Sequence, residues 1–165
     1  MSLRLDPLSA AIAQRLQTLK ILSFALIVGV VTFGIIAASI STNAAPMNAA
    51  TLNMMRLICG AIFVAGLIAG VVVRRISTTK VMTMEPRPDD AIRMNYFFVA
   101  TLVAMATLEG PALFACVLVL LSGEASELAL AAPPVLVMLW NFPTESRWRR
   151  FAMVREGQSF DRERI

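Results

Sequence analysis

The sequence predicts an all-α, polytopic membrane protein in which four helices form a transmembrane bundle. Apolar residues make up 58% of the 165-residue chain, and charged residues make up only 16%. The charges are also segregated, because long uncharged stretches alternate with short charged ones. A membrane-spanning helix needs roughly 20 predominantly apolar residues in succession. Four segments meet or approach that requirement, at about 21–40, 51–73, 96–121 and 125–142.

Residues 1–20 precede the first predicted span and are expected to form a cytoplasmic amphipathic segment. Leu8, Ile12, Leu16 and Leu19 recur at spacings of about three and four, which places them on one face of a helix. We therefore expect this segment to form an interfacial helix, from Pro7 to Lys20, along the inner surface of the membrane. The alternative is a cytoplasmic helix that packs on the central loop.

The second predicted span carries small residues at the spacing that membrane helices use for close approach. The helix-packing residues that we expect are Ala61, Ala65, Gly66, Ala69 and Gly70. The alanines form one four-residue ladder, and the two glycines form a GxxxG pair. In lipid, packing rather than hydrophobicity drives helix association. The spacing leaves open whether the close neighbour is the third span or the same helix of another subunit, and we expect a homo-oligomer.

Glu109 is the only charged residue in the third predicted span, which is otherwise uncharged. Gly110 and Pro111 follow it directly. A charged carboxylate near the middle of a membrane helix costs about 2.5 to 3.5 kcal/mol, so its default interpretation is functional. Pro111 cannot donate a hydrogen bond to the Thr107 carbonyl. That oxygen and the Thr107 hydroxyl therefore remain available near the carboxyl group. Glu109 and Thr107 are the predicted ion-binding residues.

A structural alternative for Glu109 is an ion pair with Arg56, which interrupts the start of the second span. Counted along their helices from the central loop, the two residues lie roughly 20 to 27 Å deep. Their side chains can meet if the two helices touch. Such a pair, or a protonated Glu109 hydrogen-bonded to a neighbouring helix, would be a purely structural device.

The fourth predicted span contains Pro133 and Pro134, which we expect to kink it. Such prolines are tolerated where neighbouring helices satisfy the freed carbonyl groups. Trp140 lies near the end of this span and Trp148 follows shortly after it. Amphipathic rings at such positions anchor helices at the headgroup level. We expect these tryptophans, like Tyr96 at the start of the third span, to have no binding role.

Basic residues indicate the orientation of the spans. They cluster before the first span, in a central loop at 74–94 and in a tail at 145–165, whereas the other two loops contain no Lys or Arg. By the positive-inside rule, both termini and the central loop face the cytoplasm. We therefore expect a multi-pass protein of the bacterial inner membrane with its transmembrane domain at 21–144. Its isoelectric point of about 9.8 follows from this topology, so no nucleic-acid partner is expected.

Several classes of function can be set aside. The chain has no histidine, which is the commonest metal ligand and general base. Cys59 and Cys116 lie singly in two different spans without a CxxC motif, so we expect them to be small buried apolar residues. No GxSxG, phosphate-loop or dinucleotide-binding motif occurs. We expect neither an enzyme nor a cofactor or metal site.

The middle of the chain combines a glycine-containing helix, a polar loop and a helix with a central carboxylate. The segments are Gly60 to Gly70, Arg87-Pro88-Asp89, Phe97-Phe98 and Leu108-Glu109-Gly110-Pro111-Ala112-Leu113-Phe114. In this order, residues 59–123 resemble the helical hairpin of rotary ATPase proteolipids, the c subunits of proton- or sodium-driven ATP synthases and vacuolar-type ATPases. The resemblance implies an oligomeric proteolipid in which Glu109 binds a proton or an ion. The first and fourth spans have no counterpart in the two-helix form of that family.

Two other functional classes fit the outline. Small four-span exporters of the multidrug-resistance type use one membrane-embedded glutamate to exchange protons for cationic drugs, although that family carries it in the first helix. A structural or accessory protein would use the bundle as an anchor and its charged tail to recruit a partner in a larger membrane complex. The lipid bilayer is the partner that all of these classes share.

The topology makes a first testable prediction. Residues near Arg87 and Arg155 should face the cytoplasm, while Asn48 and Gly123 should face the opposite side. Single cysteines at these positions should divide into two groups when intact cells are treated with a membrane-impermeant thiol reagent. Labelling of Gly123→Cys only after permeabilisation would overturn the four-span topology.

Overall fold

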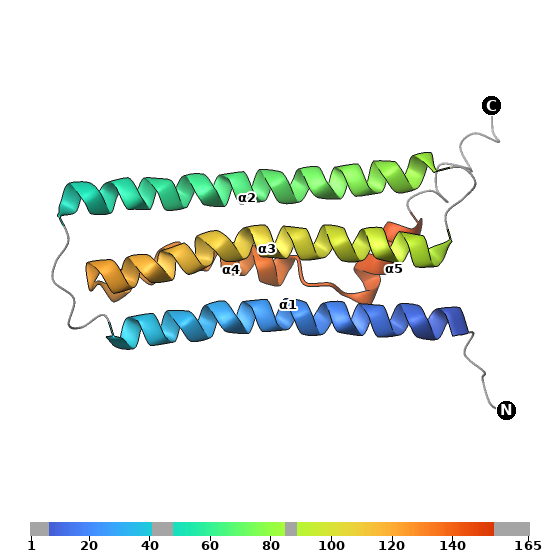
Figure 1. The fold of residues 1–165 in the computed structure, drawn as a ribbon, viewed down its shortest axis with the longest axis horizontal. Helices are drawn as coiled ribbons and strands as arrows, with labels where there is room; N and C mark the ends of the chain where they lie inside the picture. Colours follow the sequence, from blue (N-terminus) through green and yellow to red (C-terminus); the bar gives the residue numbers. More distant parts are fainter. Residues whose placement is uncertain (1–6, 41–47, 85–88, 154–165) are drawn as a thin grey trace.

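The computed structural model describes residues 7–40, 48–84 and 89–153, and every regular element in these ranges is helical (Figure 1). Three long helices come first: α1 (Pro7–Ile40), α2 (Ala49–Thr83) and α3 (Asp90–Ser122). A 3-10 helix, η2 (Ala125–Leu130), and two short helices, α4 (Ala132–Trp140) and α5 (Glu145–Met153), follow. The prediction of an all-α protein is confirmed.

α3 is the central helix of the bundle. It packs against α2 on one side and against α1 on another, and η2, α4 and α5 also lie against it (Figure 1). Half of its most apolar stretch is buried, compared with 28% for α1 and 11% for α2. α3 runs antiparallel to α2 and parallel to α1. The core of the molecule is therefore built around α3.

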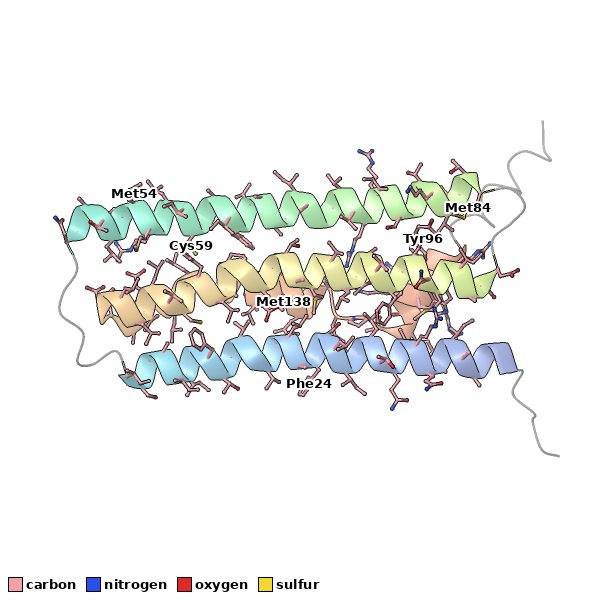
Figure 2. The ribbon with its side chains drawn as sticks, viewed as in Figure 1. Phe24, Met54, Cys59, Met84, Tyr96 and Met138 are labelled. Atoms are coloured by element: carbon pink, nitrogen blue, oxygen red, sulfur yellow. The ribbon has the colours of Figure 1, made fainter. Side chains whose placement is uncertain are left out.

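Large apolar side chains cover the outside of the bundle. Leu57 on α2 is 76% exposed, and Phe24 and Met54 point away from the neighbouring helices (Figure 2). Soluble proteins rarely expose a continuous apolar surface of this extent. Each of the three long helices is also long and apolar enough to cross a membrane. These features indicate a membrane protein.

The predicted fourth span is broken. In place of one helix over 125–142, the chain forms η2 and then α4, which has only 9 residues. Pro133 and Pro134 do not kink a helix, because they lie in the first turn of α4, where a missing N–H is tolerated. α5 then continues at 62° to the segment before it. The structure thus has three continuous candidate spans, and a fourth only if the bent segment is counted as one.

Two segments expected outside the spans continue the long helices. Residues 7–20 run directly into the first span, so the separate interfacial helix is not formed and α1 has 34 residues. α2 likewise extends to Thr83, so most of the predicted loop at 74–94 is helical. Asp89 precedes α3, whereas Arg87, Pro88 and residues 154–165 lie outside the described residues.

The apolar stripe of α1 has a partner in the protein itself. Leu16 and Leu19 are buried in a cluster with Met94, Phe97 and Trp148. Trp148 is therefore a core residue rather than an exposed anchor, and residues 145–153 of the predicted tail are folded against the bundle. Burial of large apolar side chains on three helices at once explains why this stripe does not lie on the membrane surface.

The GxxxG pair of α2 packs against α3 of the same chain. A methyl group added to Gly66 would lie 2.5 Å from the carbonyl oxygen of Thr107, which is closer than carbon and oxygen can approach. Four residues later, a methyl group on Gly70 would lie 3.5 Å from the Cβ of Ala104, an ordinary contact. In the alanine ladder Ala69 is half-buried, while Ala61 and Ala65 are exposed.

We predict that Gly66→Ala destabilises the bundle and that Gly60→Ala does not. The methyl group at position 66 meets a backbone oxygen that can yield only if α3 shifts, and overpacking of this kind costs about 1 to 3 kcal/mol. A methyl group at Gly60 has no neighbour within 4 Å. Removing a helical glycine there should be neutral or slightly stabilising. Unfolding in mixed micelles, followed by circular dichroism, measures both, and equal midpoints would contradict the close approach.

Candidate functional site

Glu109 lies near the middle of α3, at the edge of the contact between α3 and α1. Met105 and Leu108 are buried in one cluster with Ile27 of α1. Ala106 and Gly110, on the other side of the helix, are exposed, and Glu109 itself is half-buried. The carboxyl group thus sits between the core and the apolar outer surface, at a depth where that surface is covered by large apolar side chains.

The described part of the chain offers Glu109 no polar partner. No hydrogen bond and no ion pair joins its carboxylate to residues 7–40, 48–84 or 89–153. In a membrane this is the most expensive arrangement for an ionised carboxylate. An ionised Glu109 would therefore need a counter-charge from outside the described residues.

Thr107, the second predicted ion-binding residue, takes part in helix packing instead. Its hydroxyl group donates to the carbonyl oxygen of Ala104 at 3.1 Å and to that of Gly66 at 3.4 Å. Its own carbonyl oxygen, freed by Pro111, faces Gly66. A Cα–H group can partly satisfy such an oxygen where two helices approach closely. The structure therefore directs Thr107 toward α2 and does not bring it together with Glu109.

Cys59 extends this line of contacts along α2. Its thiol lies 3.6 Å from the carbonyl oxygen of Pro111, and Figure 2 shows it between α2 and α3. Cys59 and Cys116 are both free and buried, as predicted. The carbonyl oxygens of Thr107 and Pro111 thus both face α2, at Gly66 and at Cys59.

Arg56 pairs with Glu127 and not with Glu109, so that predicted alternative is wrong. Its Nε lies 3.0 and 3.2 Å from the two carboxylate oxygens of Glu127, its Nη2 contacts the same carboxylate, and its Nη1 donates to Asn53. The carboxylate of Glu124 lies 3.9 Å away. η2 packs against α3 and brings Glu127 to Arg56, and only 3% of Glu127 is exposed.

This ion pair could have been found from charge alone. Arg56 is the only cation expected near that end of the bundle, and the only acids nearby are Glu124 and Glu127. The predicted bounds of the fourth span leave Glu124 just before it and put Glu127 in its first turn, and neither acid was predicted as a partner of Arg56. The 3-10 helix η2, which contains Glu127 and follows Glu124, has only 6 residues and therefore gives no periodic pattern in the sequence. We call this end of the bundle, which holds Arg56, Glu124 and Glu127, the acidic end.

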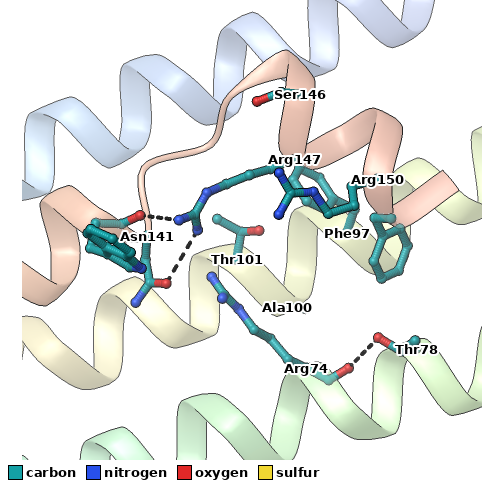
Figure 3. Close-up of a pocket in the computed structure, with 11 residues that line it drawn as sticks. Arg74, Thr78, Phe97, Ala100, Thr101, Asn141, Ser146, Arg147 and Arg150 are labelled. Atoms are coloured by element: carbon teal, nitrogen blue, oxygen red, sulfur yellow. Dashed lines mark hydrogen bonds between the residues drawn. The ribbon is translucent and has the colours of Figure 1, made fainter. Parts of the chain in front are cut away.

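Three arginine side chains line one cavity at the opposite end of the bundle (Figure 3). Its volume is about 580 Å³, and its walls come from α2, α3, the end of α4 and α5. Arg74 reaches into it from α2, and Arg147 and Arg150 reach into it from α5. We call the end that holds these residues the basic end. The cavity was missed in the sequence because its arginines were assigned to a loop and a tail.

Comparison with protein-family models, with curated proteins and with solved structures found no match. Among the residues that the structure describes, no group of acidic or cysteine side chains has the make-up of a metal site. The interpretation of Glu109 and of the basic cavity therefore rests on their own geometry.

We predict that Glu127→Gln loosens the acidic end far more than Glu124→Gln does. Loss of the Glu127 carboxylate leaves Arg56 without its bidentate partner. The Glu124 side chain is 58% exposed, and its carboxylate is 3.9 Å from the arginine. Thermal unfolding in micelles measures the difference. The double variant Arg56→Gln/Glu127→Gln should recover part of the loss, because it removes both charges. Equal shifts for the two single variants would disprove the pairing.

Proposed function

We propose that this chain is an oligomeric, proteolipid-like integral membrane protein in which Glu109 binds and releases a proton or another cation. One observation carries the proposal. Glu109 has no polar partner in the described part of the chain, and Arg56, the predicted partner, is engaged by Glu127. An ion pair with Arg56 therefore does not account for the carboxylate of Glu109.

The energetics of a lone carboxylate favour reversible binding. Keeping it ionised at this depth costs about 2.5 to 3.5 kcal/mol, and this cost is removed when a proton or cation binds. Glu109 would take up the ion from one aqueous side and release it to the other. The resemblance of residues 59–123 to a proteolipid hairpin agrees with this role for Glu109.

A second copy of the chain would complete the site. Ala106 and Gly110 flank Glu109 on the exposed side of α3, four residues apart, and Ala61 and Ala65 have the same spacing on the exposed side of α2. Small residues at this spacing permit close approach of helices in lipid. With Gly66 and Gly70 used inside the chain, these two exposed surfaces support contact between copies.

The same proposal includes the finer topology. If η2, α4 and α5 together complete a fourth, bent crossing, both termini lie on one side of the membrane. The concentration of arginine at the basic end supports a cytoplasmic location for that side, in a bacterial inner membrane.

Carbodiimide labelling tests the role of Glu109. A lipid-soluble carbodiimide reacts with a protonated carboxyl group, so it should modify Glu109 at mildly acidic pH. Glu109→Gln should abolish the modification and leave the fold intact. Glu124→Gln, which removes an exposed acid, is the control and should leave the labelling of Glu109 unchanged. Peptide mapping by mass spectrometry identifies the labelled residue.

Adding cations during the carbodiimide reaction then shows which ion Glu109 binds, because a bound ion protects the carboxyl group from the reagent. Protection of Glu109 by sodium but not by potassium would indicate a sodium site, and protection by low proton concentration alone would indicate a proton site. An unreactive Glu109 in folded protein would contradict the proposal and leave the accessory role as the better explanation.

A further inference from the structure

The cavity at the basic end holds positive charge that the described part of the chain does not neutralise. None of Arg74, Arg147 and Arg150 forms an ion pair with a carboxylate of residues 7–40, 48–84 or 89–153. Among the described residues that line the cavity there is no Asp and no Glu. A neighbouring arginine behaves differently, since Arg149 lies 2.6 Å from Glu145. The cavity thus has the charge of a site for an anion.

One of the three guanidinium groups is held in place before any ligand binds. Arg147 donates hydrogen bonds to the carbonyl oxygen of Trp140, the last residue of α4, and to the side-chain oxygen of Asn141 at 3.4 Å (Figure 3). The last carbonyl groups of a helix lack partners within that helix, so the arginine has a fixed anchor there. A side chain that is already ordered loses less conformational entropy when a ligand binds.

The α5 helix that supplies two of the arginines is itself fixed to α3. Its Trp148 and Phe151 rings pack on Phe97 of α3, with ring centroids 5.6 and 5.5 Å from that of Phe97. Arg93 of α3 donates to the carbonyl oxygen of Ala152 at 3.2 Å. The positions of Arg147 and Arg150 relative to Arg74 are therefore set by packing and not by the arginines themselves.

Neutral polar groups complete the lining. The lining holds the hydroxyl groups of Thr78, Thr101 and Ser146 and the amide of Asn141. The Thr78 hydroxyl donates to the Arg74 carbonyl oxygen and the Ser146 hydroxyl lies 3.0 Å from that of Thr144. Several guanidinium groups with added hydroxyl donors match the oxygens of a phosphate group, because arginine presents its N–H groups in a planar fork. A carboxylate offers fewer oxygens for such a set.

The sequence around the cavity places it at the end of the apolar surface, where the phosphates of phospholipids are expected. Arg74 follows directly on the uncharged stretch from Leu57 to Val73 of α2, so it marks the end of the apolar surface. Trp140 lines the cavity mouth and is 79% exposed, next to Leu136 and Leu139 on the exposed face of α4. Tryptophan at this depth is typical of the headgroup region. An acyl chain can continue from the cavity along these apolar side chains.

We propose that this cavity binds a phosphate group through Arg74, Arg147 and Arg150, and that the phosphate belongs to an anionic phospholipid of the adjacent leaflet. Free inorganic phosphate presents the same chemistry, and the experiment separates the two sources. The proposal does not depend on the role of Glu109.

Native mass spectrometry of the full chain, purified in a neutral detergent, tests the site. Titration with phosphatidylglycerol should give a first binding event at least about tenfold tighter than titration with phosphatidylcholine. Arg74→Gln and Arg150→Gln should each weaken that event about tenfold, as expected for the loss of one charge-assisted contact. Arg150 is exposed, so its variant keeps the test valid if Arg74→Gln does not fold.

Two variants with the same change of charge serve as matched controls. Arg75 is the next residue on α2 but does not line this cavity, and Arg149 is paired with Glu145. Arg75→Gln and Arg149→Gln should change the affinity for phosphatidylglycerol by less than about twofold, because only nonspecific attraction is reduced. Equal losses in all four variants would overturn the proposal in favour of a diffuse basic surface.

A second titration uses inorganic phosphate with the protein in phosphatidylcholine nanodiscs. Binding of phosphate that depends on Arg74 and Arg150, without preferential binding of phosphatidylglycerol, would make the lipid assignment wrong and assign the cavity to a soluble anion. Binding of phosphatidylglycerol that depends on both arginines, with no measurable binding of free phosphate, would confirm the lipid source.

Discussion

The close approach of α2 to α3 at Gly66 and Thr107 is the constraint on which the rest of the structure depends. It is possible only because glycine has no side chain and because Pro111 leaves the Thr107 carbonyl free to face another helix. Since the two helices are antiparallel, this contact also sets their register. Arg56 is thereby carried to the acidic end and Arg74 to the basic end, each about 12 to 15 Å along α2 from Gly66.

The sequence predicted what depends on composition and local spacing. Long apolar runs identified the three continuous spans, and four-residue spacing identified the close packing of Gly66 and Gly70. It did not predict the broken segment after Gly123, because its hydropathy matches that of a span while its hydrogen bonds follow a 3-10 helix and a short α-helix. Proline position mattered more than proline presence, since Pro133 and Pro134 start a helix there.

The candidate sites likewise contain features that local sequence predicts and features that only the fold reveals. Glu109 could be identified because an acid in an apolar run is locally unusual. That none of the described residues pairs with it could be established only from the fold. Arg56 was assigned the wrong acid, because depth along separate helices does not say which loop folds back. The basic cavity joins Arg74 to Arg147, which are 73 positions apart in the chain (147 minus 74) and meet only through the packing of α5 on α3. No local pattern carries that information.

The central position of α3 has a consequence for the order in which the protein can assemble. α1 and α2 pack mainly on α3 and make at most marginal contact with each other. We therefore expect α1 and α2, which are synthesised first, to enter the bilayer as two nearly independent helices, each stable there because its backbone hydrogen bonds are satisfied internally. On this expectation tertiary structure begins when α3 joins them, and a chain interrupted before Asp90 would hold two helices with no core to join them.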